Sequence, residues 1–337
     1  MKRYNNLYEK ICDIENLRMA HKMARKGKNW YEEVKMVDAN PDKYLYKLQE
    51  DLINKTYKTS SYETFTKVDK GKIREISKLP YYPDRICQWA IMLQIEPIII
   101  GSLIYDTYAS LPKRGIHIAL DRVKSAIHNV KETQYCFKFD IKKYFPNIDH
   151  DILKVLIRKK IKDKDLLWLL DEIIDSCENG IPIGNYLSQY FANFYLSYFD
   201  HWMKEEMKCN YYFRYMDDVV VLSDTKKHLH KLKEKVEEYL STNLKLRLKE
   251  NWQIFPTFTR GIDFVGYRIF KDYVLLRKST VRNIKYKIKK FKKRKPKDYD
   301  LNFIMSYMGW LEYCDSYNFK KKYMFPSIWL LYYEGLL

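Results

Sequence analysis

The residues best suited to chemistry are two adjacent carboxylates, Asp217 and Asp218, which follow Arg214, Tyr215 and Met216. Apolar runs flank this string on both sides, which predicts a β-hairpin with the acids at its tip. Neighbouring carboxylates repel each other unless a cation or hydrogen bonds offset their charge. Mg²⁺ prefers oxygen ligands and often takes one or two carboxylates together with substrate phosphates. The string therefore predicts a Mg²⁺ site with Asp217 and Asp218 as ligands.

A third carboxylate, Asp140, ends the apolar run YCFKFD at residues 135–140. On its own, an Asp after a strand is most often a turn residue or a helix cap. Its combination with a later Asp pair in a basic chain favours a shared role in a metal-dependent reaction on phosphates. We therefore expect Asp140 to act together with Asp217 and Asp218.

The elements that must position these acids alternate between helical and strand patterns. Apolar residues recur every three or four positions in the helical segments and alternate with charged residues in the strands. The predicted helices cover 1 to about 60, 83–101, 152–174, 187–207 and 226–240. Besides the hairpin at Asp217, the predicted strands are a hairpin at 62–79, a buried strand at 135–139, a pair near 244–254 and a single strand at 264–270. This mixture predicts an α+β protein.

Residues 278–297 contain eleven basic side chains and no acid. Within them Val281, Ile284, Ile288 and Phe291 are spaced by three, four and three residues, which predicts one apolar stripe on a basic helix. A solvated charged face is the simple interpretation, and membrane docking is a weaker one. In a basic chain we favour a surface that follows nucleic-acid phosphates.

The composition supports a nucleic-acid partner. The 337 residues include 62 Lys plus Arg against 43 Asp plus Glu, which gives a formal net charge of +19 and favours a polyanion. A basic surface that only maintains solubility is the alternative, but 31 Tyr, 16 Phe and 7 Trp also offer rings on which bases can stack. We therefore favour nucleic acid over a membrane surface.

Other site classes receive little support from the sequence. Its six cysteines include no close pair, so neither a zinc site nor a disulfide framework is predicted. His150 and the other histidines lack metal-ligand partners at helical spacing, and we assign none to catalysis. No apolar run approaches the roughly 20 residues of a membrane span, so we expect no membrane partner and a cytoplasmic location.

Four strings in order, FDIKKYFPNIDH, IPIGNYLSQYFANFYL, RYMDDVVVL and IDFVGYRI, resemble successive motifs of a reverse transcriptase. Most members of that family carry a Gln before the Gly of the second motif and Ser-Pro after it. This chain has Ile183 before Gly184, and then Ser188 and Gln189. That pattern is similar to reverse transcriptases of diversity-generating retroelements, which copy a template RNA into cDNA with errors at adenines.

The resemblance implies a right-hand polymerase fold with fingers, palm and thumb. The implied parts are an N-terminal helical extension at 1–60, fingers at 61–134, the first part of the palm at 135–149, a helical connection between fingers and palm at 150–180, the palm with the YMDD hairpin and primer grip at 181–270, and a basic helical thumb at 271–337.

The resemblance also implies an RNA-directed DNA polymerase in which single residues have defined roles. Asp140, Asp217 and Asp218 would hold two Mg²⁺ ions, for which Mn²⁺ could substitute. The backbone carbonyl of Ile141 would add a ligand. Lys249 lies near the position of a proton donor to pyrophosphate.

Further matches concern the nucleotide and the nucleic acid. Lys72 and Arg74 match the basic pair that clamps the incoming triphosphate, although two exposed hairpin charges are the simpler interpretation. Phe145, if it is not merely a core residue, matches the ring that blocks the ribose 2′ hydroxyl and so favours dNTPs over rNTPs. The resemblance places the remaining candidates at the nucleotide (Ile183, Gly184 and Gln189) or at the template and primer (Arg85, Ser188, Tyr215, Met216, Phe264 and Gly266).

Ile183 stands where the family has an amide that touches the nascent base pair. An apolar side chain cannot supply that hydrogen bond, which is worth on the order of 1 kcal/mol, so we expect low fidelity. The implied partners are a template RNA, an RNA/cDNA duplex, dNTPs and a small basic accessory variability protein.

Several alternatives remain open from the sequence. The first is a bacterial defence-associated reverse transcriptase, and a retron or group II intron enzyme is less favoured by Ile183 and Ser188. An RNA polymerase of the same palm class would be expected to carry a polar or acidic residue at Phe145 and Gly at Met216. A nucleic-acid-binding module without catalysis is the alternative of another class, and the three aspartates argue against it.

Overall fold

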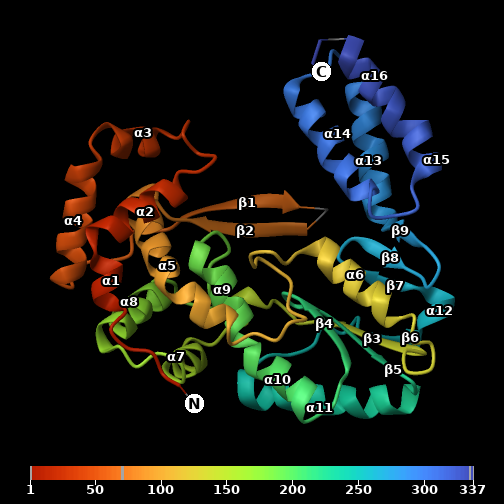
Figure 1. Cartoon of the computed structure of the whole chain (residues 1–337), viewed down its shortest axis with the longest axis horizontal. Helices are drawn as coiled ribbons and strands as arrows, with labels where there is room; N and C mark the ends of the chain where they lie inside the picture. The colour runs from red at the N-terminus through yellow and green to blue at the C-terminus, as the bar shows by residue number, and fades with distance from the viewer. Residues whose placement is uncertain (1, 70–71, 334, 337) are drawn as a thin grey trace. The chain divides into compact units, whose positions relative to one another are not determined.

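The computed structural model describes residues 2–69, 72–333 and 335–336, except for the side chains of 68–74 (Figure 1). The chain forms two compact units, each assembled from separate stretches of sequence. Unit 1 comprises Met1–Tyr105, Ile141–Met207 and Lys235–Lys249, and unit 2 comprises Asp106–Asp140, Lys208–Glu234 and Glu250–Leu337. Asp140 and Ile141, although adjacent, are therefore assigned to different units.

Unit 1 is mainly helical and is arranged around α5 (Ile86–Ile100), which packs against α1, α2 and α9 (Figure 1). The sequence of α5 is apolar on nearly every side, as a helix surrounded by other helices requires. The other elements of the unit are α1 (Tyr8–Cys12), α2 (Ile14–Ala24), α3 (Glu32–Ala39), α4 (Pro41–Ile53), the hairpin β1 (Glu63–Asp69) and β2 (Lys72–Lys78), η1 (Tyr81–Arg85), η2 (Phe145–Asn147), α7 (His150–Arg158), α8 (Lys164–Asp175), α9 (Tyr186–Tyr195) and α10 (Ser197–Glu205). The helix α11 (Lys226–Leu244) begins in unit 2 and ends in unit 1.

Unit 2 contains two antiparallel sheets. The first has the strand order β4-β5-β3-β6, with β4 at Tyr211–Tyr215, β5 at Asp218–Ser223, β3 at Tyr135–Asp140 and β6 at Gln253–Pro256. The second has the order β7-β8-β9, with strands at Ile262–Phe264, Tyr267–Ile269 and Val274–Leu276. The helices of the unit are α6 (Ile116–Ala126), α12 (Thr257–Arg260), α13 (Lys278–Phe291), α14 (Asp298–Leu311), α15 (Tyr317–Phe319), η3 (Lys320–Met324) and α16 (Phe325–Tyr333). One apolar core joins side chains of both sheets to α6, α13, α14 and α16.

The basic helix that the sequence predicts is α13, and its apolar stripe faces the core of unit 2. Ile284, Ile288 and Phe291 are buried, and Val281 packs against the same cluster. Most of the Lys and Arg side chains on the helix are exposed. The periodicity was sufficient here because one apolar face and one charged face have a single stable orientation at a protein surface.

Two predicted strand segments are wrong. The segment 264–270 is not one strand, because Val265 and Gly266 have φ of 43° and 93° and form a turn between β7 and β8. Near 244–254 there is no strand pair; an isolated bridge joins Ile141 to Leu248, and β6 begins only at Gln253.

Two long predicted helices are each divided. The segment 152–174 is split into α7 and α8, because Asp163 accepts a hydrogen bond from the backbone N–H of Leu166 and so begins a new helix. The segment 187–207 is split at Leu196 into α9 and α10. Among the helices of the described part of the chain, none is long and apolar enough to cross a membrane.

Candidate active site

The predicted acidic hairpin is formed by β4 and β5, and Met216 and Asp217 make its two-residue turn. Tyr215 pairs with Asp218 across the turn, and Met216 has a φ of 55°. A positive φ at the first turn residue matches the right-handed twist of the two strands. The pairing places Asp217 at the tip and Asp218 at the start of β5, as the sequence predicts.

Asp140 and Asp218 lie directly opposite each other. They end and begin neighbouring antiparallel strands, and their Cα atoms are partners in the β3–β5 register. Two carboxylates in such a pair destabilise each other unless a positive charge intervenes. The register therefore brings together the two acids that are far apart in the sequence.

The electrostatics of Asp218 reflect this arrangement. Burial raises the pKa of its carboxyl group to about 6; the ammonium of Lys138 opposes the rise, and the charge of Asp140 adds to it. Lys138 Nζ lies 2.9 Å from Asp218 Oδ1 as an ion pair and donates a hydrogen bond to Oδ2 at 3.2 Å. Lys138 also donates to the backbone carbonyl of Asp263. Sequence reasoning missed Lys138, although its place two residues before Asp140 on the same strand puts both side chains on one face of the sheet.

Arg214 is the second residue that sequence reasoning missed. Its side chain is fully buried, and its Nη1 donates a hydrogen bond to the carbonyl oxygen of Met216 at 2.9 Å. Its backbone N–H donates to Asp106 and its carbonyl accepts from Tyr108, at 3.0 and 3.1 Å. A positive charge in an otherwise apolar strand was the available signal, since a buried Arg requires partners.

A hard divalent cation fits the chemistry of these donors. Asp140, Asp217 and Asp218 offer carboxylate oxygens, the preferred ligands of Mg²⁺, and the buried Asp218 Oδ1 has the Lys138 ammonium as its neighbour at 2.9 Å. Within the residues that the structure describes, however, no three His, Cys, Asp or Glu side chains are gathered closely enough to form a metal cluster. In this conformation the ammonium of Lys138 supplies the positive charge next to Asp218.

A cavity of about 320 Å³ opens beside these carboxylates within unit 2. Acidic and basic side chains both line it. The acids are Asp140, Asp218 and Asp263, and the bases are Lys138, Arg260, Arg268 and Arg277. Arg277 forms an ion pair with Asp263, whereas the Nε atoms of Arg268 and Arg277 are buried without a hydrogen bond. Guanidinium groups beside carboxylates suit a ligand that combines phosphates with a metal ion.

The predicted primer grip corresponds to the turn between β7 and β8. Gly266 is required there, because a Cβ at this position would lie 2.5 Å from Cζ3 of Trp310 in α14. The ring of Phe264 is fully buried in the core of unit 2, and the expected role of this residue at the primer stays a prediction. Phe264 can contribute to such a surface only through its backbone.

In unit 1, the loop before α9 carries Ile183 and Gly184. The carbonyl of Ile183 accepts a hydrogen bond from the N–H of Ser77 at 3.0 Å, and a Cβ at Gly184 would lie 2.3 Å from the Ser77 carbonyl oxygen. The backbone of β2 thus approaches Gly184 closely, and the expected place of Gly184 at the nucleotide stays a prediction. Ser188 is buried in the first turn of α9, and Gln189 beside it is half-buried.

Arg85 and Phe145, also in unit 1, are both half-buried. Arg85 lines a pocket of about 130 Å³ with Lys28 and Tyr186, and burial lowers the pKa of its guanidinium. Phe145 begins η2 and makes an edge-on ring contact with Tyr144 at a centroid distance of 5.7 Å.

The remaining candidates are divided between the two units. Ile141 is fully buried and Lys249 half-buried in unit 1, while Tyr215 packs at the edge of the unit 2 core. Lys72 and Arg74 lie in β2, but their side chains are outside the described part of the chain. Unit 2 thus holds the three aspartates, and unit 1 holds the candidates for contact with the triphosphate and the sugar.

The class of protein that fold and site define is confirmed by sequence comparison. The model of the family "Reverse transcriptase (RNA-dependent DNA polymerase)" matches residues 58–269. The chain therefore belongs to the reverse transcriptase family. With its mixed helices and sheets, this membership confirms the α+β class and the right-hand polymerase fold.

The chain is also similar to individual proteins. Protein YkfC of Escherichia coli (strain K12) is 25% identical over 245 residues, which are 60% of this chain and 64% of YkfC. Group II intron-encoded protein LtrA of Lactococcus lactis subsp. cremoris is 30% identical over 144 residues, 40% of this chain and 23% of LtrA. The chain thus spans less than two thirds of the length of these relatives. Among solved structures, telomerase from Candida albicans in complex with a fragment of telomeric RNA is 11% identical, with 77% of this chain and 55% of that chain covered at a TM-score of 0.49.

Proposed function

We propose that this protein is an active RNA-directed DNA polymerase that copies a template RNA into cDNA from dNTPs. The observation that carries the proposal is the pairing of Asp140 with Asp218, next to Asp217 on the hairpin turn, in a chain of the reverse transcriptase family. A polymerase without catalysis would have no need to keep acids in direct opposition, since the pair destabilises the fold.

In this proposal Asp140, Asp217 and Asp218 hold two Mg²⁺ ions, with Mn²⁺ as a substitute and the Ile141 carbonyl as a further ligand. When bound, the ions supply charge neutralisation at the phosphates and lower the pKa of the primer 3′ hydroxyl. The cations of the unit 2 cavity face the same acids and would neutralise phosphate oxygens that enter it. Lys249 is proposed to protonate the leaving pyrophosphate.

The proposed contacts of unit 1 follow the family pattern. Lys72 and Arg74 clamp the triphosphate, and Phe145 excludes the ribose 2′ hydroxyl. Ile183 and Gln189 lie at the nascent base pair. Contacts to template and primer are proposed for Arg85 and Ser188 in unit 1, and for Tyr215, Met216 and the Gly266 turn in unit 2.

Primer extension tests the activity directly. The purified full chain is given a primed RNA template, Mg²⁺ and either dNTPs or rNTPs, beside the variant Asp217→Asn. We expect extension with dNTPs that Asp217→Asn abolishes. If no extension occurs even with accessory protein and cognate RNA added, the protein is a nucleic-acid-binding module and the proposal is wrong.

We further propose that the enzyme serves a diversity-generating retroelement and errs at template adenines. The string IPIGNYLSQ supports this, because Ile183 cannot donate or accept the hydrogen bond of the usual amide. An oligomeric accessory variability protein is the proposed partner. Sequencing of the cDNA from wild type and Ile183→Gln tests the idea: errors should cluster at adenines and become fewer in the variant. An unchanged error spectrum would remove Ile183 from the explanation.

A second candidate function is that of an intron-encoded reverse transcriptase. The similarity to LtrA and to nuclear intron maturase 1 of Arabidopsis thaliana, 24% identical over 106 residues, favours it. Accurate cDNA together with selective binding of a structured intron RNA would support this candidate. Accurate cDNA without such binding would favour a defence-associated enzyme.

A further inference from the structure

The backbone of Phe145 is packed directly against a glycine turn that follows α8. Gly180 is buried with a φ of 64°, and a Cβ there would lie 2.3 Å from the Phe145 carbonyl oxygen and 2.6 Å from Cα of Pro146. The N–H of Ile181 donates to that same carbonyl at 3.0 Å. Any residue larger than glycine at position 180 must therefore displace Phe145.

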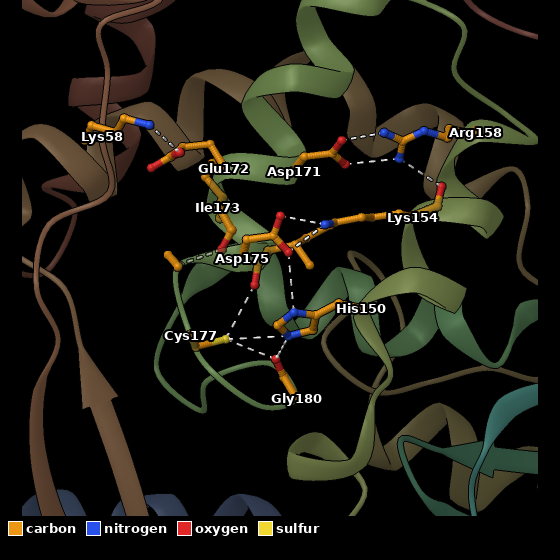
Figure 2. Close-up of polar contacts among 12 residues, drawn as sticks. Lys58, His150, Lys154, Arg158, Asp171, Glu172, Ile173, Asp175, Cys177 and Gly180 are labelled. Atoms are coloured by element: carbon orange, nitrogen blue, oxygen red, sulfur yellow. Dashed lines mark hydrogen bonds and ion pairs between the residues drawn. The ribbon is translucent and has the colours of Figure 1, made fainter.

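The glycine turn is itself held by the side chains of His150, in α7, and Cys177, in the loop after α8, as Figure 2 shows. His150, the first residue of α7, places Nε2 2.5 Å from the Gly180 carbonyl oxygen, and Cys177 Sγ lies 3.0 Å from that oxygen. Because a carbonyl only accepts, the Nε2 atom carries a proton. His150 Nδ1 lies 3.5 Å from Oδ1 of Asp175. The other carboxylate oxygen of Asp175, Oδ2, forms an ion pair with Lys154 Nζ at 2.6 Å.

The Cys177 and His150 pair is not a nucleophilic dyad. Cys177 Sγ is 3.9 Å from His150 Nε2, and that nitrogen is already the donor to Gly180. Burial raises the pKa of the Cys177 thiol, which disfavours the reactive thiolate. Both side chains instead converge on one backbone oxygen, and a contact of that kind holds a turn in place.

We propose that His150 and Gly180 are positioning residues that set the place of the Phe145 ring and thereby the preference for dNTPs over rNTPs. The inference rests on the proposed function, in which Phe145 excludes the 2′ hydroxyl. Steric exclusion of one hydroxyl depends on where the ring edge lies, so a small backbone shift is enough to weaken it. The chain of contacts runs from His150 through the Gly180 carbonyl and the turn to Phe145.

Single-nucleotide addition by the full-length protein tests the proposal. The measured quantity is kcat/KM for a dNTP divided by that for the matching rNTP, in wild type and in Phe145→Ala, Gly180→Ala, His150→Ala and His150→Gln. We expect Gly180→Ala and His150→Ala to lower this ratio by roughly tenfold, mainly through better use of the rNTP. Gln retains an N–H that can reach the Gly180 carbonyl, so His150→Gln should recover most of the ratio.

A matched control variant distinguishes a displacement of Phe145 from a general loss of protein stability. Arg158→Gln removes the ion pair with Asp171 between α7 and α8 and touches neither Gly180 nor Phe145. It should lower Tm as His150→Ala does and leave the nucleotide ratio unchanged. Hydrogen exchange supplies a readout without catalysis: the Ile181 amide should exchange faster in His150→Ala and not in Arg158→Gln.

The outcomes are distinguishable. If Phe145→Ala lowers the ratio but His150→Ala and Gly180→Ala leave it unchanged, the positioning role is wrong and the proposed function stands. If Arg158→Gln lowers the ratio as much as His150→Ala does, general destabilisation explains the effect and the inference is overturned. If wild type adds no dNTP under any condition, the proposed function is wrong and the inference is overturned with it.

Discussion

The buried guanidinium of Arg214 donates a hydrogen bond to the carbonyl oxygen of Met216 at 2.9 Å, and so a single side chain supports the turn that carries Asp217. Met216 adopts a φ of 55°, which is rare for a residue with a side chain. The hydrogen bond offsets part of that cost, and burial makes the contact insensitive to solvent.

Replacement of Arg214 should therefore affect both stability and activity. Arg214→Met fills the space but leaves the Met216 carbonyl without this donor, and we expect a loss of about 2 kcal/mol in the free energy of unfolding. Urea unfolding and primer extension would measure the two effects. Arg282→Met, the same substitution on the exposed face of α13, should leave stability nearly unchanged. Equal stability of both variants would contradict the supporting role of Arg214.

Lys138 is expected to compete with Mg²⁺ for Asp218, because its ammonium lies 2.9 Å from the Asp218 carboxylate. The variant Lys138→Met should lower Tm in EDTA, since Asp218 loses its positive neighbour. Addition of Mg²⁺ should then raise Tm more in the variant than in wild type. Thermal unfolding across a Mg²⁺ titration checks this, and a smaller Mg²⁺ effect in Lys138→Met would show that the lysine does not compete with the cation.

The contact between Gly266 and Trp310 predicts a measurable coupling. Gly266→Ala combines a strained φ with a clash against the indole, and should destabilise the protein by about 2 to 4 kcal/mol. Trp310→Phe removes the clashing ring atom, so the double variant should be more stable than the sum of the single effects by about 1 kcal/mol. Denaturant unfolding of wild type, the two single variants and the double variant completes this double-mutant cycle. Simple additivity would mean that strain in the turn, rather than Trp310, requires the glycine.

Asp163 is expected to make stability dependent on pH. Its carboxylate accepts from the N–H groups of Leu7, Tyr8 and Leu166 at 2.7, 3.0 and 3.1 Å. Burial opposes ionisation, but the backbone hydrogen bonds outweigh it and lower the pKa of Asp163 below the ordinary value of 3.8. The folded state therefore prefers the ionised form. Its stabilisation is present above pH 3.8 and is lost as the pH falls through the lowered pKa.

The variant Asp163→Asn tests this sign. The variant should have a free energy of unfolding about 2 kcal/mol lower than that of wild type at pH 7. This difference in stability should become smaller below about pH 4. Asp272→Asn, at an exposed position, should show no difference at either pH. If the difference in free energy of unfolding between wild type and Asp163→Asn increased toward acid pH, the lowered pKa of Asp163 would be contradicted.

The exposed face of α13 is expected to bind nucleic-acid phosphates. Conversion of Arg282 and Lys289 in α13, and of Lys292 at its C-terminal cap, to Gln removes three exposed cations and leaves the buried stripe intact. The slope of log K against log salt for single-stranded RNA should become shallower by about 2. Fluorescence anisotropy at several salt concentrations measures it. The triple exchange Lys22→Gln, Lys26→Gln and Lys35→Gln, at exposed positions of unit 1, is the control for net charge alone; an equal change there would exclude a specific role of α13.

The sequence by itself determined the parts of the site that depend on local pattern. The acids Asp217 and Asp218 at a hairpin tip follow from apolar runs on either side, and the buried stripe of α13 follows from helical spacing. Asp140 at the end of a strand was predicted in the same way. Each of these features depends on neighbours within a few residues, and that is the range over which periodicity carries information.

The tertiary structure decided which groups meet across the chain. Strand register placed Asp140 opposite Asp218, and the fold brought the Asp263 carbonyl to Lys138. The fold also placed Gly266 against Trp310, which is more than forty residues away in the sequence. Such contacts depend on pairing register and on packing between distant elements, for which a single sequence contains no periodic signal. For the same reason His150, which no spacing rule singled out, was found only through its contact with Gly180.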